Sequence, residues 1–399
     1  MQAGLGTSVR DFREPGPGPG LRLLRQDPLL LLATLGIVGC SIYTIWSATN
    51  TDIPGDPYYY VLRQSLYAGV GVLLMFVVAN FDYSRVREWR IGIYATLIAS
   101  ILVLFALAGA TRGSKRWISF PFFNFQPSEL GKLLLILALA GFLVDRTRRM
   151  SERDTTRRIM LLALLPAILV IAQPDLGSGL VYLTIATALL FVAGTKWTHF
   201  AVLGFLGAAA VTIVLVAAPA AGVHVLKDYQ VQRLTAFINP SHDPRDQGYQ
   251  LNQSITAIGS GEKTGRGPEG ATQTKLDFIP EHHTDFIFSV VGEEFGFVGC
   301  AFVLSLYALL IWRALRILTT AKNLYGSLLA GGILAMIMFQ LFVNVGMTLG
   351  IMPITGVPLP LMSYGGSSVL VTLLALGVLQ SVHVQARESF VSKGRGSLL

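Results

Sequence analysis

Long apolar runs separated by short polar segments make up most of the chain. Each run approaches the roughly 20 residues that an α-helix needs to cross the hydrocarbon core of a bilayer. Because no alternating strand pattern is present, the sequence predicts an all-α integral membrane protein rather than a membrane β-barrel. Ten transmembrane helices are predicted, near residues 27–48, 58–80, 91–110, 127–144, 157–173, 177–193, 199–217, 285–311, 325–349 and 364–384.

Composition and charge support a membrane protein and set its orientation. Hydrophobic residues make up 52% of the 399 residues and charged residues 14%, against roughly 25% charged in soluble domains. A net charge of +8 could indicate nucleic-acid binding. The basic residues lie in short loops between apolar runs, however, so they indicate topology and no nucleic-acid partner. The short loops of one alternate set hold only Arg112, Lys115 and Arg116, which places both termini in the cytoplasm by the positive-inside rule.

This orientation gives a domain layout. Residues 1–26 are polar, contain a Pro/Gly run and have no cleavable signal peptide, so they are predicted to be a disordered cytoplasmic tail. Residues 27–386 form the ten-span membrane domain, and 387–399 form a second cytoplasmic tail. Residues 218–284, between spans seven and eight, are too long for a passive connection. We expect this large extracytoplasmic loop to contain short helices that lie over the membrane face.

The cysteines and histidines give little support for a metal centre. Cys40 and Cys300 both lie inside apolar runs, where they are expected to be small core residues. His282 and His283 are adjacent, and neighbouring residues on a helix point about 100° apart. The two histidines are therefore not expected to coordinate the same zinc ion.

Charged residues flank the start of the fourth span. Arg112, Lys115 and Arg116 precede it, and three cations beside a helix N-terminus could bind an anion on the outer face. Glu129 and Lys132 are three residues apart, so they share a helix face, and each needs the other at membrane depth. The alternative is a structural ion pair with lipid-headgroup contacts.

Two further polar segments could contribute to the same cavity. Asp175, in an outer turn, is expected either to cap the next helix or to line the cavity with Glu129 and Lys132. Gln253 lies in a polar stretch ahead of the glycine-rich run 259–270. That run is not a Walker motif, because no Gly-Lys-Ser/Thr closes it. Flexibility and a close backbone approach to a polar ligand both stay open.

The stretch 278–299 carries the leading catalytic candidate. Asp285 opens an apolar helical run that also holds Glu293 and Glu294. An ionisable group at the end of a membrane helix has a high free-energy cost of burial, so such a residue is treated as a candidate functional residue. Burial raises the pKa of a carboxylate and nearby cations lower it, so Asp285 could act as a general base or hold a hard cation such as Mg²⁺. Capping of the helix is the remaining alternative.

Proline and glycine are too dense in residues 352–366 for a membrane helix. Irregular backbone at membrane depth is tolerated only against protein or a cavity, so we expect this segment to line the site. Ser363, Ser367 and Ser368 could cap the last helix, and the first two are also candidates to line the cavity. Asn344 lies in mid-span and is expected to form a hydrogen bond within the bundle.

Five blocks of sequence, in the order in which they occur in the family, resemble the SEDS proteins (shape, elongation, division and sporulation). The resemblance covers about residues 28–386. The blocks are Gly113–Ile118, Gln126–Glu129 with Lys132, Gln173–Gly177, Pro280–Phe288 with Glu293 and Glu294, and Pro360–Ser368. Residues 352–360 are more similar to the rod-shape (RodA) branch than to the division (FtsW) branch.

The resemblance implies a ten-span peptidoglycan glycosyltransferase of the inner (plasma) membrane. Such proteins polymerise lipid II into glycan strands on the outer face, here during cell-wall elongation and rod-shape maintenance. A class B penicillin-binding protein, other elongation-complex membrane proteins and a divalent cation, Mg²⁺ or Mn²⁺, are implied as well. The family's catalytic aspartate falls on Asp285, and its Glu and Lys of the fourth span fall on Glu129 and Lys132. Gly131 stands where many members carry alanine.

The residues and the resemblance together predict a mechanism. Asp285 removes the proton from the sugar hydroxyl of lipid II that attacks the anomeric carbon of the growing strand. Arg112, Lys115, Arg116 or a magnesium ion stabilises the polyprenyl pyrophosphate that leaves. A lipid II flippase, a division- or sporulation-type polymerase and a non-catalytic scaffold are the alternatives. The charged blocks cluster at the outer ends of the spans, which favours an outer-face enzyme over a flippase with access from both sides.

Overall fold

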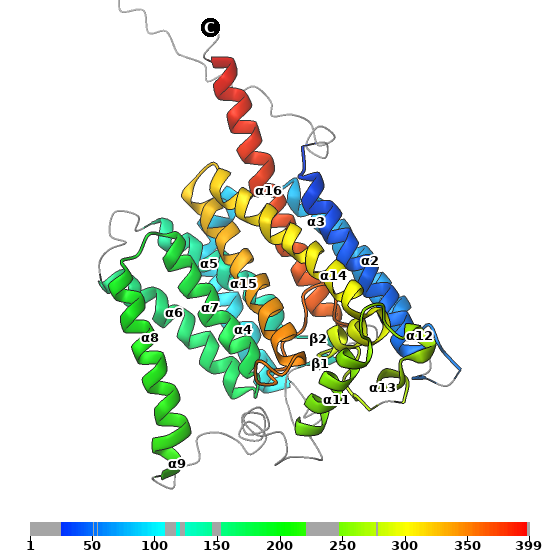
Figure 1. Ribbon diagram of the computed structural model, residues 1–399. Coiled ribbons are helices and arrows are strands. Elements are labelled where there is room, and N and C mark those ends of the chain that lie inside the picture. Colours follow the sequence, from blue (N-terminus) through cyan, green and yellow to red (C-terminus); the bar gives the residue numbers. More distant parts are fainter. Residues whose placement is uncertain are drawn as a thin grey trace, which may run out of the picture.

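The computed structural model describes residues 25–50, 52–53, 55–107, 117–119, 124–145, 153–220, 247–276 and 278–396. Helices make up most of this part of the chain (Figure 1). In order, the elements are α2 (Pro28–Thr49), α3 (Tyr59–Ala79), η1 (Tyr83–Trp89), α4 (Arg90–Leu107), β1 (Ile118–Ser119), β2 (Asn124–Phe125), α5 (Pro127–Val144), α6 (Arg153–Ala172), α7 (Leu176–Val192), α8 (Trp197–Thr212), η3 (Ile213–Ala217), α9 (Ala218–Ala220), α11 (Gln247–Ser260), α12 (Gly267–Gly270), α13 (Thr272–Lys275), α14 (Ile287–Thr320), α15 (Leu324–Thr348) and α16 (Gly366–Gly396). The strands β1 and β2 form one short antiparallel pair, in which Ile118 lies opposite Phe125.

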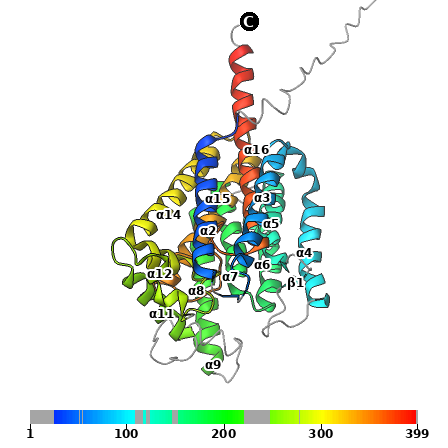
Figure 2. The ribbon, with the colours of Figure 1, turned by 90° about the vertical axis from the view of Figure 1, so that its right-hand side faces the viewer.

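The long helices stand side by side as a bundle, with α5, α15 and α16 its most enclosed members (Figures 1 and 2). α16 packs along α3, α14 along α2 and α15, and α6 along α7. At the edge of the bundle, α8 has no buried residue, although its sequence is apolar on every side. An apolar helix that is exposed all round is suited to hydrocarbon and not to water.

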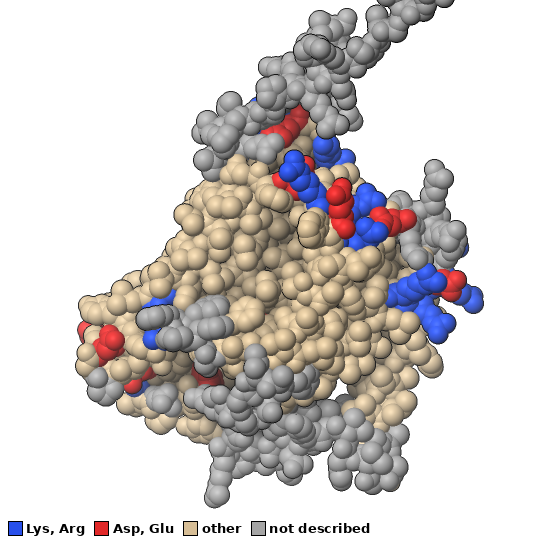
Figure 3. All heavy atoms as spheres, turned by 180° about the vertical axis from the view of Figure 1, so that it is seen from behind, with Lys and Arg blue, Asp and Glu red and all other residues tan. Residues whose placement is uncertain are grey.

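Seven described helices are long and apolar enough to cross a membrane, namely α2, α3, α5, α6, α14, α15 and α16. α7 and α8 are shorter apolar helices of 17 and 16 residues, and α4 has 18 residues. Each of the predicted apolar runs overlaps one of these helices. Figure 3 shows a broad face with almost no charged side chains, while charges gather mainly along its upper right edge.

Two of the differences between predicted and observed helix boundaries change the description of the site and of the C-terminal tail. α14 begins at Ile287, so Asp285 lies in the turn just before the helix and not on it. α16 continues to Gly396, so most of the predicted C-terminal tail is helical. In the large loop 218–284, the described residues contain the short helices α9, α11, α12 and α13, as expected, and residues 221–246 lie outside the described part.

A buried acid joins three helices at the end of the bundle nearer the C-terminus. Asp27 is fully buried and caps α2, because its Oδ1 accepts hydrogen bonds of 3.1 Å from the backbone N–H groups of Leu29 and Leu30. Its Oδ2 accepts one of 2.8 Å from Nε of Arg313 on α14. Gln380 on α16 accepts the backbone N–H of Asp27 at 2.8 Å. These contacts fix α2, α14 and α16 relative to one another.

The glycine-rich loop after α11 lies against a break in α14. Gly296 has a φ of 63°, which interrupts the helix and turns backbone groups outward. The N–H of Phe297 donates to the carbonyl of Glu262 at 2.9 Å, and the N–H of Arg266 donates to the carbonyl of Glu293 at 2.9 Å. A Cβ at Gly261 would lie 1.8 Å from the carbonyl oxygen of Gly292. The glycines therefore serve a close approach of backbone to backbone within this chain.

Candidate active site

An ion pair lies at the start of α5, at the end of the bundle away from the C-terminus. Lys132 Nζ is 2.6 Å from Glu129 Oε1, and both side chains are almost fully buried. A lone charge in such surroundings would cost several kcal/mol, so the two residues need each other. Glu129 lies in the first helical turn, where the helix dipole favours an acid. The predicted pairing of these residues is confirmed.

Asp175 connects the N-termini of α5 and α7. Its Oδ1 accepts the backbone N–H of Ser178 at 3.1 Å, which confirms the predicted cap. Its Oδ2 accepts Ser128 Oγ at 3.1 Å and Gln126 Nε2 at 3.2 Å. Tyr182 adds a hydrogen bond of 3.0 Å to the carbonyl of Ser128. Asp175 therefore caps α7 and, through the same network of buried groups, joins α7 to the start of α5.

The prediction that Ser363 and Ser367 cap the last helix is wrong. Ser367 Oγ donates to the carbonyl of Asn124 at 2.9 Å and accepts the N–H of Gln126 at 3.0 Å, which joins α16 to the start of α5. Ser363 Oγ donates to the carbonyl of Thr284 at 2.6 Å and accepts the N–H of Leu359 at 2.8 Å. Their short side chains are used to bridge segments that the sequence alone does not show to be neighbours.

Three consecutive backbone carbonyl groups in the turn that carries Asp285 each accept a hydrogen bond. The carbonyl of His283 accepts the N–H of Tyr364 at 2.9 Å, and the carbonyl of Thr284 accepts Ser363. The carbonyl of Asp285 itself accepts Asn344 Nδ2 at 2.9 Å, which confirms the predicted hydrogen bond of Asn344 within the bundle. The backbone at Asp285 is therefore fixed, while the residue as a whole is half-buried.

The irregular segment 352–366 supplies two of these three contacts, and Asn344 on α15 supplies the third. The backbone of this segment is irregular up to the start of α16, yet no more than 1% of the surface of Leu359, Leu361 and Met362 is exposed. Burial raises the pKa of Tyr364 to about 12, so its hydroxyl stays protonated and cannot serve as a base near neutral pH. Tyr364 is therefore not a candidate base, and Asp285 stays the candidate predicted from the sequence.

Glu293 and Glu294 have structural partners. Glu293 is fully buried and accepts the backbone N–H groups of Gln273 at 2.8 Å and Thr274 at 3.0 Å, so it caps α13. Glu294 Oε1 accepts Ser47 Oγ at 2.8 Å, which joins α14 to α2. The two acids therefore hold α13 and α2 against α14.

The remaining predicted residues are less informative. Arg112, Lys115 and Arg116 lie outside the described residues. Gln253 is half-buried on α11, whereas its neighbour Ser254 is fully buried and was missed. Ser254 Oγ lies 2.6 Å from Ser289 Oγ and donates to the carbonyl of Thr348 at 2.8 Å. The spacing of Leu251, Ser254 and Ala257 at every third residue could have placed Ser254 on the buried face.

Asp285 was also predicted as a metal ligand. Within the described residues it belongs to no cluster of three ligating side chains. Magnesium in enzymes is commonly held by one or two carboxylates together with substrate phosphates, and a single half-buried carboxylate fits that mode. Asp285 offers one carboxylate to such a cation, and the described residues supply no all-protein cage around it.

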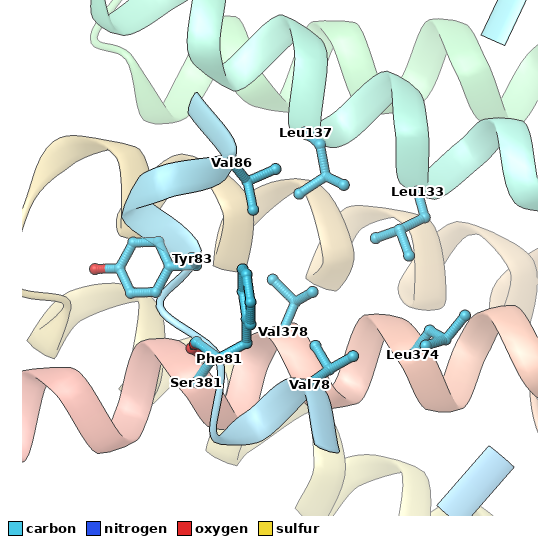
Figure 4. A pocket seen from close by; sticks show the side chains of 9 residues that line it. All are labelled: Val78, Phe81, Tyr83, Val86, Leu133, Leu137, Leu374, Val378 and Ser381. Atoms are coloured by element: carbon cyan, nitrogen blue, oxygen red, sulfur yellow. The ribbon is translucent and has the colours of Figure 1, made fainter. Parts of the chain in front are cut away.

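An apolar pocket of about 210 Å³ lies away from these residues, between the end of α3, η1, α5 and α16 (Figure 4). Its two polar side chains are already engaged. Ser381 Oγ donates to the carbonyl of Phe81 at 2.6 Å, and Tyr83 OH donates to Asn323 Oδ1 at 3.2 Å. The pocket offers no polar group for chemistry, so the polar groups at the other end of the bundle are the better candidate site.

The fold and this site define a multi-pass membrane protein with a polar site at one end of its helical bundle. A family model described as "Cell cycle protein", which groups FtsW, RodA and SpoVE, matches residues 25–388, and the chain belongs to this family, the SEDS proteins. Stage V sporulation protein E of Bacillus subtilis is 38% identical over 90% of this chain and 95% of its own length. The peptidoglycan glycosyltransferase MrdB of Escherichia coli is 36% identical over 90% and 94%.

Solved structures agree with this assignment. A chain from a study of the structural coordination of polymerization and crosslinking by a peptidoglycan synthase complex has a TM-score of 0.75 and 32% identity, covering 90% of this chain and 98% of its own. The rod shape determining protein RodA of Thermus thermophilus has a TM-score of 0.65 and 29% identity, covering 90% and 96%. An FtsW relative of the division group, from Geobacter sp. (strain M18), is 35% identical over 92% of this chain and 99% of its own length. Relatives from the sporulation, rod-shape and division groups thus match over similar lengths, and identity alone does not select a branch.

Proposed function

We propose that the protein is a peptidoglycan glycosyltransferase that polymerises lipid II into glycan strands. The observation that carries the proposal is the match to MrdB, named a peptidoglycan glycosyltransferase, over 90% of the chain at 36% identity. The site geometry supports it, because Asp285 is placed on a fixed backbone at one end of the bundle. The similarity of residues 352–360 to the rod-shape branch favours a role in elongation.

In the proposed topology, α2 to α8 and α14 to α16 give ten crossings of the inner membrane. An even number places both termini on one side, and the basic loops place that side in the cytoplasm. The turn with Asp285, α11 and the ion pair of Glu129 and Lys132 then lie toward the extracytoplasmic face, where the membrane-anchored disaccharide is polymerised.

In the proposed reaction, Asp285 accepts the proton of the sugar hydroxyl as this oxygen attacks the anomeric carbon. General base catalysis of this kind contributes about 10²- to 10⁴-fold. The bond from the anomeric carbon to the pyrophosphate oxygen breaks, and the polyprenyl pyrophosphate leaves. One base and no covalent sugar intermediate would invert the anomeric centre, by analogy with hydrolases.

The leaving pyrophosphate needs positive charge near it. Arg112, Lys115 and Arg116 precede α5 in sequence and are proposed to supply part of it. A bound Mg²⁺ or Mn²⁺ would add electrostatic stabilisation of the leaving oxygens. The ion pair of Glu129 and Lys132 is proposed to keep the α5 end of the cavity in register with Asp175.

A class B penicillin-binding protein is the proposed partner, within a complex that includes other elongation proteins. The likeness to a chain of a peptidoglycan synthase complex that coordinates polymerization with crosslinking supports this partner. Transpeptidation by the partner would consume the strands that this protein makes.

Polymerisation of purified lipid II, read as glycan products on a gel, tests the proposal. Wild type, alone or with its partner, is compared with Asp285→Ala and Asp285→Asn, with crosslinking blocked by a transpeptidase inhibitor. Polymer from wild type and none from the folded variants is expected. Polymer that persists in both variants would remove Asp285 from the chemistry, and no polymer from wild type with partner would favour a flippase, to be tested by headgroup translocation in liposomes.

A further inference from the structure

Two histidines and an aspartate from distant parts of the chain meet beside the turn that carries Asp285. Asp52 lies in the connection between α2 and α3, and His282 and His283 lie in the turn before α14. One ligand atom from each of the three residues lies within 4.8 Å of the others. His282 Nε2 is 3.3 Å from Asp52 Oδ2.

The hydrogen bonds fix which nitrogen of His282 carries a proton. Its Nδ1 lies 2.9 Å from the carbonyl oxygen of Ile279, and a carbonyl can only accept, so Nδ1 must donate. In the neutral ring, Nε2 then presents a lone pair to the carboxylate of Asp52. Two acceptors do not attract each other, so the contact requires either a proton shared between the ring and the carboxyl group or a metal ion.

The geometry fits a metal ion. Two ligand atoms each about 2.1 Å from a tetrahedral zinc ion lie about 3.4 Å apart. The 3.3 Å between His282 Nε2 and Asp52 Oδ2 is close to this separation. Metal-binding histidines also typically donate their other ring N–H to a carbonyl or carboxylate, as His282 does to Ile279.

The sequence-based objection to a histidine site does not apply to this turn. That objection assumed two adjacent histidines on a helix, where they diverge by about 100°. Residues 280–286 form a turn, in which both rings can face the same point. The ring of His283 packs against two aromatic rings, with its centroid 4.8 Å from that of Tyr60 and 5.7 Å from that of Tyr364.

We propose that Asp52, His282 and His283 bind a divalent transition metal of the zinc class. Imidazole nitrogens favour Zn²⁺ over the hard Mg²⁺, which prefers oxygen ligands. Three protein ligands leave a fourth position for water. The ion joins the α2–α3 connection to the turn of Asp285 and so stabilises the backbone of the candidate base. This site is separate from the cation proposed at Asp285 and does not depend on the proposed reaction.

Metal binding to the purified full chain in detergent tests the site. After treatment with a chelator, wild type is titrated with Zn²⁺ against a chromophoric competitor, and with Co²⁺ to record the visible bands of a tetrahedral site. We expect one equivalent of Zn²⁺ per chain, no competition by Mg²⁺, and a higher Tm with zinc. Loss of an outer hydrogen-bond partner weakens metal binding roughly 10- to 100-fold. Asp52→Asn and His282→Gln each remove a direct ligand, so each should weaken zinc binding by more than that.

Matched controls come from the same chain. Asp56→Asn changes an exposed acid of the same connection, and His199→Gln changes a histidine on α8, and both should bind zinc as wild type does. Equal binding by wild type and both cluster variants would overturn the site. Absence of binding by wild type, with a Tm that rises at low pH, would assign the contact to a protonated histidine paired with Asp52 and would overturn it too. The wild-type Co²⁺ spectrum decides the question even if a variant fails to fold.

Discussion

At the scale of single residues, the buried ion pair of α5 gives the sharpest stability test. Lys132→Met would leave Glu129 buried without its cation, and breaking a buried pair in this way costs about 3–5 kcal/mol. The double variant Glu129→Gln with Lys132→Met removes both charges and should recover most of that loss. Thermal unfolding in detergent, followed by intrinsic fluorescence, measures the three proteins.

The control for this comparison is an ion pair near the surface. Arg25 and Glu388 are 3.8 Å apart and partly exposed, so Glu388→Gln should change stability by less than about 1 kcal/mol. A double variant as unstable as Lys132→Met alone would contradict the assignment, because it would show that the loss comes from packing and not from the unpaired acid.

Several residue roles could be predicted from sequence because their partners are local. Glu129 and Lys132 are one turn apart on a helix, and Asp175 caps the helix that starts beside it. The caps expected at Ser363 and Ser367 were wrong because the partners of these side chains, Thr284 and Asn124, are distant in sequence. A short polar side chain at a helix start fits a cap equally well, and only the packing of loops decides between the two.

At the scale of elements, the contact between the glycine-rich loop after α11 and helix α14 is the one most sensitive to an added methyl group. Gly261→Ala would place a Cβ 1.8 Å from the carbonyl oxygen of Gly292, so either the loop or α14 must move. We expect a lower Tm and a large loss of lipid II polymerisation, since α14 follows directly from the turn with Asp285. Both quantities can be measured on protein purified in detergent.

Gly259→Ala is the matched control, because nothing lies within 4 Å of a Cβ at that position. Gly259 lies within α11, where alanine stabilises a helix by up to about 1 kcal/mol relative to glycine. The control should therefore keep its activity and its Tm. Equal losses in both variants would argue against the close backbone approach at Gly261 as the cause of the loss.

The helices themselves could be predicted because each is encoded by an apolar run of nearly the right length. The break of α14 at Gly296 could not, since a glycine inside an apolar run is equally typical of helix packing. The partner that makes the break favourable is the loop 261–266, whose N–H and carbonyl groups bond to the exposed backbone of α14. Such a contact depends on two segments and leaves no pattern in either one.

At the scale of the whole molecule, the two ends of the bundle have different tasks. Asp27, Arg313 and Gln380 clamp three helices at one end, while the turn with Asp285 and the ion pair of α5 lie at the other. The sequence placed these ends on opposite sides of the membrane from the distribution of basic residues. It could not show that the α2–α3 connection reaches the turn of Asp285, where Asp52 meets His282.

Labelling of single cysteines tests the orientation of the two ends. In a background with Cys40→Ser and Cys300→Ser, Thr256→Cys places a thiol on the exposed side of α11, and Lys322→Cys places one between α14 and α15. An impermeant maleimide that reaches the outer face of the membrane is added to intact cells. If α11 faces outward, the reagent should label the Thr256→Cys variant. It should label the Lys322→Cys variant only after the membrane is opened. The reverse pattern would place Asp285 on the cytoplasmic side, where extracytoplasmic polymerisation is impossible. Retained polymerisation by both labelled variants would show that the result describes the active fold.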